Sequence, residues 1–148
     1  MNNGQIKIIK YEEVFADQTV RMWRDSKEQA INQNERHHIH SHKYYLSHIL
    51  PDHYDIDLAL LDNQVIGMIA YNEVEISQLY IHVDYQGIGI GKQLLNRAKN
   101  YSNGKLQLYT FDKNEYAKTF YEKNGFKKVG IQLENEENLT AIQYEWRK

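Results

Sequence analysis

Residues 86–91, which read QGIGIG, place three glycines in six positions directly before a helical pattern. Glycine loses more backbone freedom on folding than any other residue, so this density indicates an unusual backbone path or a close approach to another group. The preceding residues 75–83 (EISQLYIHV) predict a strand, and residues 90–101 carry an apolar stripe at helical spacing. The chain must therefore fold with a strand, a glycine-rich turn and a helix in that order.

Such a turn can bind an anion. Backbone N–H groups of a first helical turn have no intrahelical partner and lie at the positive end of the helix dipole, so they can donate to a phosphate that no Cβ atom blocks. Gly87, Gly89 and Gly91 lack Cβ atoms, while Gln86 and Lys92 can add a donor and a charge. The same glycines also suit a strand-to-helix turn without a ligand. Neither the dinucleotide fingerprint nor the Walker pattern fits this spacing.

Periodicity along the rest of the chain predicts alternating groups of strands and helices. Strands are expected over residues 6–10, 56–61, 65–71, 75–83, 106–111, 126–133 and 140–147. Helices are expected over residues 11–24, over 26–50 with an interruption near 34–42, over 90–101 and over 114–123. This order predicts an α/β (α+β) chain built around one mixed sheet, in a single domain that spans residues 1–148.

Composition excludes several classes of protein. The chain has no cysteine, which removes disulfides and thiolate nucleophiles and fits a reducing compartment. Its formal net charge of −2 argues against nucleic acid or an anionic membrane as a partner. No apolar run reaches the roughly 18–20 residues of a membrane span, and the first ten residues lack a signal-peptide hydrophobic region. We expect a soluble, cytoplasmic protein.

Two segments resemble one known family. The pattern Q-x-x-G-x-G at Gln86, Gly89 and Gly91, and the block NEYAKTFYEKNGF at residues 114–126, resemble motifs of the GCN5-related N-acetyltransferase (GNAT) superfamily. The resemblance covers roughly residues 56–132 well and residues 1–55 by element order alone. It implies the GNAT fold, which has a central mixed, mostly antiparallel sheet of about seven strands flanked by four helices.

The resemblance implies transfer of an acetyl group from acetyl-CoA to an amine, with no metal. By resemblance, backbone N–H groups of residues 86–92 hold the CoA pyrophosphate, and the backbones of Ile81 and Val83 pair with the pantetheine arm. Asn114 is expected to contact CoA, and Tyr121 is expected near the thioester sulfur. The expected CoA-binding residues are Ile81, His82, Val83, Gln86, Gly87, Ile88, Gly89, Ile90, Gly91, Lys92, Asn114, Lys118 and Tyr121.

Two residues are catalytic candidates. The leaving group is a thiolate, and a phenol with a pKa of about 10 stays protonated at neutral pH and can donate to it. Tyr121 would be this acid, although it could also be a core aromatic beside Phe120 and Phe126. Glu75 is the candidate base for the amine, and it could equally be a solvated strand end. Since no cysteine can carry the acetyl group, direct attack in a ternary complex is expected.

The acceptor remains open on sequence alone. Five histidines lie in residues 35–48. His38 and His42 have the i, i+4 spacing of metal ligands but lack a HExxH pattern, which argues against a metal site. The segment could instead bind substrate or form a polar connection between helices. The expected acceptor is the amine of a small molecule or peptide. Two alternatives are a protein N-acetyltransferase and a non-catalytic acyl-CoA sensor. Either a monomer or a homodimer fits the sequence.

Overall fold

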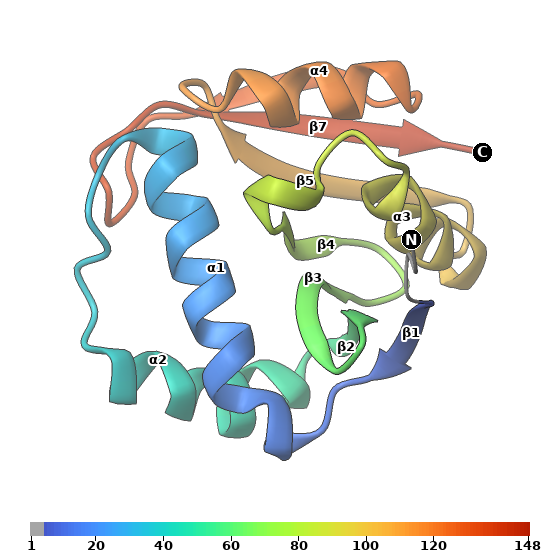
Figure 1. The fold of residues 1–148 in the computed structure, drawn as a ribbon. Helices are drawn as coiled ribbons and strands as arrows, with labels where there is room; N and C mark the ends of the chain where they lie inside the picture. Colours follow the sequence, from blue (N-terminus) through green and yellow to red (C-terminus); the bar gives the residue numbers. More distant parts are fainter. Residues whose placement is uncertain (1–4) are drawn as a thin grey trace.

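The computed structural model describes residues 5–148 (Figure 1). Within these residues the strands form two antiparallel sheets. The first contains β1 (Ile6–Lys10), β2 (Asp55–Leu61), β3 (Gln64–Tyr71) and β4 (Ile76–Ile81), in that spatial order. The second contains β5 (Lys105–Phe111), β6 (Lys127–Gln132) and β7 (Ala141–Arg147), with β7 in the centre. Asp62 and Asn63 turn the β2–β3 hairpin with positive φ angles, which Asp and Asn tolerate better than most residues.

The two sheets meet at a single point. Glu75, just before β4, forms an isolated parallel bridge with Gln107 of β5, and the Gln107 N–H donates to the Val74 carbonyl at 3.0 Å. No other pairing between β4 and β5 is found in residues 5–148. The predicted single mixed sheet is therefore split into two antiparallel halves, which the one parallel bridge found in the described part of the chain joins. Beyond this bridge the two strands are not paired, and side chains of both line one cavity.

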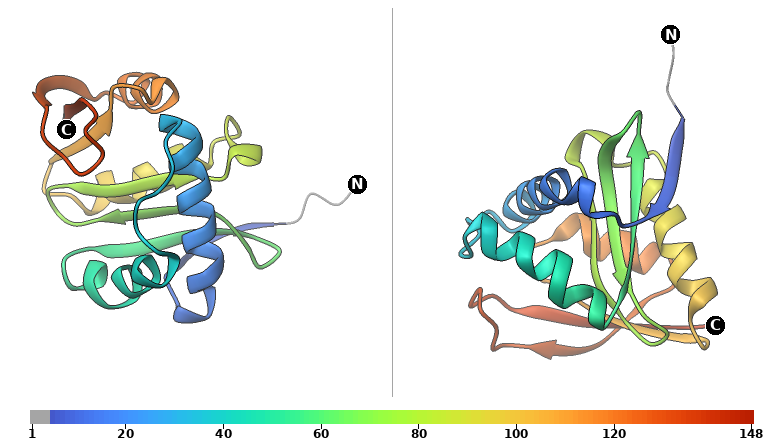
Figure 2. Two further views of the ribbon diagram at one scale, coloured as in Figure 1. Left: turned by 90° about the vertical axis from the view of Figure 1, so that its left-hand side faces the viewer. Right: turned by 90° about the horizontal axis from the view of Figure 1, so that it is seen from below.

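Helices cover both faces of the first sheet. The helices α1 (Ala16–Ile31) and α2 (Ile39–Tyr44) lie on one face, and α3 (Ile90–Tyr101) lies on the other (Figure 2). The fourth helix, α4 (Glu115–Lys123), packs on the second sheet, where the ring centroids of Tyr121 and Tyr144 are 6.2 Å apart. Two buried apolar clusters result, one beneath α1 and α2 and the other between the sheets, α3 and α4. The predicted GNAT-type arrangement of strands and four helices is confirmed.

Local capping explains where the predicted boundaries were wrong. The first helix, expected over 11–24, begins at Ala16 after a 3-10 turn at Glu13–Phe15 and continues to Ile31. It ends there because Asn32 adopts a left-handed conformation (φ 52°) and donates its N–H to the Glu28 carbonyl. After α2, the helical path continues through residues 45–52, so the predicted interruption of the 26–50 region is confirmed at residues 32–38.

The strand expected over 75–83 is also shorter. It ends at Ile81, because the imidazole of His82 accepts a hydrogen bond from the Asp84 N–H at 3.1 Å and turns the chain. Val83–Tyr85 form a 3-10 turn that leads into the glycine-rich segment. Contrary to the expectation, the backbone of Val83 is therefore not extended for strand-like pairing with a ligand.

In the described residues, no helix combines the length and the apolar character that a bilayer crossing requires. The expected cytoplasmic location stays a prediction. So do the single-domain organisation of residues 1–148 and the choice between monomer and homodimer.

Candidate active site

The glycine-rich segment forms a turn of free backbone donors at the start of α3. Gly87 and Gly89 have φ angles of 82° and 93°, which L-residues with side chains rarely adopt, and Gly89 is the N-terminal capping residue of α3. Among the described residues, no acceptor pairs with the backbone N–H groups of residues 87–92. The turn therefore presents a row of donors at the positive end of the α3 dipole, which suits a phosphate.

The three glycines serve different purposes. A Cβ atom at Gly87 or Gly89 would meet no atom within 4 Å, so positive φ is what selects glycine there. A Cβ atom at Gly91 would lie 3.2 Å from the Phe120 ring, so Gly91 lets α3 approach α4. Glycine at residue 91 is therefore explained by packing against α4, which differs from the expected role of clearing a path for phosphate. Gln86 also differs, because its side-chain amide donates to the Ile81 carbonyl at 3.2 Å.

A cleft of about 460 Å³ runs beside this turn. Ile81 and Val83 line it on one side, Phe120 and Tyr121 on the other, and α1 closes it through Ser26, Gln29 and Ala30. The sequence did not predict that α1 lines this cleft, because nothing in residues 26–30 distinguishes them from an ordinary polar helix face. Ser26 is buried and donates from Oγ to the Ile81 carbonyl at 3.3 Å, which fixes α1 against the end of β4.

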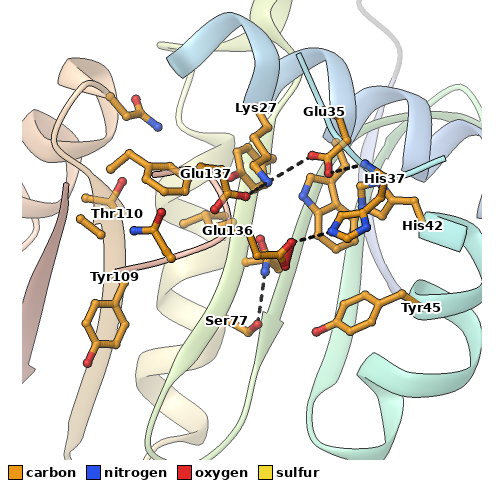
Figure 3. A pocket seen from close by; sticks show the side chains of 18 of the residues that line it. Lys27, Glu35, His37, His42, Tyr45, Ser77, Tyr109, Thr110, Glu136 and Glu137 are labelled. Carbon is orange, nitrogen blue, oxygen red and sulfur yellow. Dashed lines mark hydrogen bonds and ion pairs between the residues drawn. The ribbon is translucent and has the colours of Figure 1, made fainter. Parts of the chain in front are cut away.

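A larger chamber of about 840 Å³ adjoins the cleft (Figure 3). Its walls come from α1, the connection after α1, α2, β4, β5 and the connection between β6 and β7. The cleft and the chamber share five lining residues: Leu79, Tyr80, Asn114, Ala117 and Tyr121. The two cavities therefore meet where β4 faces α4, and a molecule in each could react at that junction.

Tyr121 stands at this junction with its hydroxyl free. The side chain is buried, and burial, followed by the nearby Tyr80, raises its pKa well above the usual value. No hydrogen bond to the Tyr121 hydroxyl is found within the described residues. Tyr80, which lines the same junction, also has its pKa raised, to about 12, chiefly by burial. Both phenols are therefore protonated at neutral pH and can act only as donors or neutral acceptors.

Asn114 is placed by its role at the start of α4. Its Oδ1 accepts the Ala117 N–H at 3.1 Å, which caps the helix. The side-chain nitrogen has no partner among the described residues, and Asn114 lines both cavities. A residue that caps a helix and keeps a free amide donor at the junction can hold a carbonyl or phosphate oxygen of a ligand.

Eight expected site residues lie outside the lining of both cavities: Glu75, His82, Gly87, Ile88, Gly89, Ile90, Lys92 and Lys118. Five of them belong to the glycine-rich turn, which lies beside the cleft, and the other three have contacts elsewhere. Lys118 pairs with Asp112 at 2.8 Å and Glu115 at 3.0 Å, contacts that raise its pKa. His82 caps the turn after β4. The Glu75 carboxylate accepts a hydrogen bond from the Tyr54 hydroxyl at 2.5 Å beside the bridge between the sheets. The structure thus does not bring Glu75 to the junction.

The histidine segment lies along the chamber. His37, His40 and His42 line it, whereas His38 and His48 do not. His42 packs against Trp23 with ring centroids 4.2 Å apart, and its pKa is lowered to about 4, first by burial. In residues 5–148, no three histidine or carboxylate groups gather closely enough to hold a metal ion.

A charged cluster on the chamber wall was not expected from the sequence. Lys27 of α1 pairs with Glu35 at 3.1 Å and with Glu137 at 2.8 Å, and Glu136 contacts His37 at 2.6 Å (Figure 3). Glu136 and Glu137 belong to the connection between β6 and β7, about a hundred residues away in the chain. The acidic run at residues 134–137 (ENEE) is visible in the sequence, but its position over α1 is set by tertiary packing.

Comparison with known families identifies the chain. The sequence profile of the Acetyltransferase (GNAT) domain matches residues 13–148. The chain belongs to the GNAT acetyltransferase family. The profile includes most of residues 1–55, where the motifs of the chain gave no specific match. No curated protein sequence matches the chain.

Solved structures of GNAT acetyltransferases share this fold at low sequence identity. Apo YjaB from Escherichia coli is 20% identical over 96% of this chain and 97% of its own, with a TM-score of 0.78. PaiA N-acetyltransferase from Thermoplasma acidophilum, solved with coenzyme A, is 22% identical over 97% and 99%, with a TM-score of 0.74. An acetyltransferase from Thermus thermophilus is 20% identical over 100% of both chains, with a TM-score of 0.76. These similarities establish the fold.

Proposed function

We propose that this GNAT protein transfers an acetyl group from acetyl-CoA to a primary amine by direct attack in a ternary complex. The observation that carries the proposal is the meeting of two cavities at Tyr121. The cleft beside the glycine turn would take the pantetheine arm, and the chamber would take the amine. Both reactants can then be bound at once, which direct transfer requires.

The free donors of residues 87–92 support the cofactor assignment. A pyrophosphate placed against them would receive several backbone hydrogen bonds together with the favourable field of the α3 dipole. The similar PaiA N-acetyltransferase was solved with coenzyme A. The Ile81 carbonyl already accepts from Ser26 and Gln86, so the arm would pair with backbone groups other than that oxygen. No metal takes part in the proposed reaction.

The chemistry assigns a proton donor to Tyr121. The neutral amine nitrogen attacks the thioester carbonyl carbon, the carbon–sulfur bond breaks, and the electron pair leaves on sulfur. A protonated phenol can donate to the departing thiolate and recover a proton from the acetylated nitrogen through water. The net reaction converts amine and acetyl-CoA into amide and CoA thiol. The raised pKa of Tyr121 keeps it in the donor form throughout the neutral range.

An alkyl ammonium must first lose a proton, which costs about 4–5 kcal/mol at pH 7. Glu75 lies outside both cavities, so its proposed role as base lacks support from the geometry. The substitution Glu75→Gln tests it through the pH dependence of turnover. An unchanged profile would exclude Glu75 as the base, and a loss of the acidic limb would establish it.

The experiment that tests the function measures CoA release from acetyl-CoA by the full chain against a panel of amines and peptides. Mass spectrometry of the product identifies the acetylated atom. We expect release that depends on a small amine and yields an N-acetyl product. Release with peptides alone would favour the protein N-acetyltransferase, and binding of acetyl-CoA without release would favour the sensor. An O-acetylated product would contradict transfer to nitrogen.

A further inference from the structure

The charge of the acceptor chamber points to one kind of amine. Glu35, Glu136 and Glu137 line it, and Lys27 is the only lysine or arginine that does so among the described residues. Three carboxylates and one ammonium leave a formal charge of −2 with the histidines neutral, and −1 if His37 carries a proton. The sign is negative in either case. A cavity of this sign attracts cations and repels a second carboxylate.

Lys27 is not available to bind an acidic group on a substrate. Its ammonium already contacts one carboxylate on each side, and its side chain is 16% exposed. Burial opposes the charge of Lys27, but the contacts with Glu137 and Glu35 outweigh burial and raise its pKa. Arg36 lies outside the lining and donates to the backbone carbonyl of Glu136. Among residues 5–148, an incoming carboxylate would therefore find no free lysine or arginine in the chamber lining.

The remaining walls suit a hydrocarbon chain that carries positive charge. Aromatic rings line the chamber at Trp23, Tyr44, Tyr45, Tyr80 and Tyr109. Aliphatic side chains line it at Ile49, Ile76, Leu79 and Leu108. Ring faces attract ammonium groups, and apolar walls bury methylene groups. The chamber thus combines cation-binding groups with apolar surface, and it opens onto the junction at Tyr121.

We propose that the acceptor is an aliphatic amine with a second cationic group, which the carboxylate wall of the chamber recognises while the first amine reaches the junction at Tyr121. The inference rests on the proposed function and adds the substrate class. Glu136 is the specificity-determining residue of this wall: its side chain is 61% exposed, and its carboxylate has no lysine or arginine partner among the described residues. An acceptor with a carboxylate at the same distance from its amine is selected against.

A four-carbon series tests the proposal with matched reactivity. Diaminobutane, butylamine and aminobutyrate share an alkyl amine and end in an ammonium, a methyl group and a carboxylate. We expect kcat/KM for acetylation to fall in that order, by about tenfold between the first and the last after correction for the two amines of diaminobutane. Equal values, or a preference for aminobutyrate, would overturn the proposal.

Variants of the connection between β6 and β7, at the acidic residues 134–137, show which carboxylate causes the preference for diaminobutane. Glu136→Gln should reduce the ratio between diaminobutane and aminobutyrate by several-fold, and Glu136→Lys should invert it. Since Glu136 is largely exposed, neither change should prevent folding. Glu134→Gln removes a carboxylate from the same connection but outside the chamber lining, so it should leave the ratio unchanged. The same response from Glu134→Gln and Glu136→Gln would contradict recognition by the chamber wall.

Calorimetric titration of the CoA-loaded protein with diaminobutane and aminobutyrate separates this proposal from the proposed function. Tighter binding of diaminobutane without any turnover would support recognition of a dicationic amine by the chamber and count against the proposed enzyme activity. Turnover without preference in either assay would support the enzyme and refute the substrate class.

Discussion

Two neighbouring buried tyrosines differ at their hydroxyl groups. The Tyr144 hydroxyl donates to Glu122 at 2.7 Å, whereas the Tyr121 hydroxyl has no partner among the described residues. A buried phenol usually finds a hydrogen-bond partner, since leaving one unmade has a cost. Tyr121 is also one of the five residues that line both cavities. Its hydroxyl is not one of the sealed polar atoms without a partner, so it is open to the cavities, where a bound thioester can accept its hydrogen bond.

The substitution Tyr121→Phe should therefore separate chemistry from binding and stability. We expect kcat to fall by about 10- to 100-fold because a proton donor is lost. The dissociation constant for acetyl-CoA and the free energy of unfolding should change little, because no intramolecular hydrogen bond is removed. Steady-state kinetics, calorimetric titration and urea unfolding provide the three values.

Tyr144→Phe is the matched control for Tyr121→Phe. It removes the hydrogen bond to Glu122, so stability should fall by about 1 kcal/mol while kcat is retained. If Tyr121→Phe had full kcat, Tyr121 could not be the proton donor.

His42 makes stability depend on pH. Burial holds its pKa at about 4, compared with 6.5 for an ordinary histidine. The unfolded chain therefore binds more protons than the folded chain between these values, and stability is lost as the pH falls through this window. Between pH 7 and pH 5 the wild type should lose about 1–2 kcal/mol more than His42→Gln, after a discount for partial solvent access.

Urea unfolding at the two pH values measures this difference. His48→Gln, which changes an exposed histidine of the same segment, is the control and should behave like the wild type. An equal pH response of the wild type and His42→Gln would show that His42 is not held neutral by the fold.

At the scale of elements, the start of α3 determines the cofactor site. Gly89 caps the helix at φ 93° and lies in the middle of the free donors of residues 87–92, so its backbone conformation affects their direction. Gly89→Ala should cost about 1–2 kcal/mol in stability, because an L-residue is strained there. It should also weaken acetyl-CoA binding by about tenfold as the donors shift away from the pyrophosphate.

Gly104→Ala provides the comparison. Gly104 has a φ of 104°, lies between α3 and β5, and has only the Cβ atom of Lys148 within 4 Å of an added Cβ atom. The backbone strain should be similar, and acetyl-CoA affinity should be unchanged because Gly104 follows the C-terminal end of α3, whereas the free donors lie at its start. Equal loss of affinity in both variants, measured by calorimetry, would mean that general strain rather than the α3 turn controls binding.

Elements bounded by local signals were predictable from the sequence. The bounds of α3, Ile90–Tyr101, agree with the apolar stripe, and the Asp62–Asn63 turn agrees with residues that tolerate positive φ. The end of β4 was not predicted, because it depends on one hydrogen bond from the Asp84 N–H to the His82 ring. Side-chain capping of this kind leaves a strand-like pattern unchanged, so periodicity continues past the real boundary.

At the scale of the whole molecule, the connection between β6 and β7 of the second sheet contacts α1, which covers the first sheet. The connection between β6 and β7 reaches back to α1, as Figure 1 shows, and Lys27 holds it through Glu137. Lys27→Met would leave Glu35, whose side chain is 4% exposed, and Glu137 without their cation. Loss of one partner from a largely buried pair should cost about 3 kcal/mol in stability.

The same variant should lower the KM for a dicationic acceptor, because the chamber keeps Glu35 and Glu137 but loses the lysine that neutralises them. Lys43→Met is the matched control, since Lys43 pairs with the exposed Asp17 at 2.7 Å and such surface pairs contribute no more than about 1 kcal/mol. Urea unfolding compares the two. Equal losses of stability would show that the Lys27 cluster acts as an ordinary surface pair.

The chamber itself could not be predicted from the sequence. The motifs at residues 86–91 and 114–126 identified the family, and of the five junction residues they gave Asn114 and Tyr121. The pairing of Lys27 with Glu137 joins residues 110 positions apart, and no pattern in either segment encodes it. Substrate choice therefore depends on contacts that only the tertiary structure reveals.

A crystal structure of the full chain with CoA tests the central claim most directly. The account predicts the pyrophosphate against the N–H groups of residues 87–92, the arm in the cleft, and the sulfur within hydrogen-bond distance of the Tyr121 hydroxyl. The amine chamber should remain open on the other side of Tyr121. A complex in which CoA lies outside the cleft, or its sulfur points away from Tyr121, would contradict the proposed site of transfer.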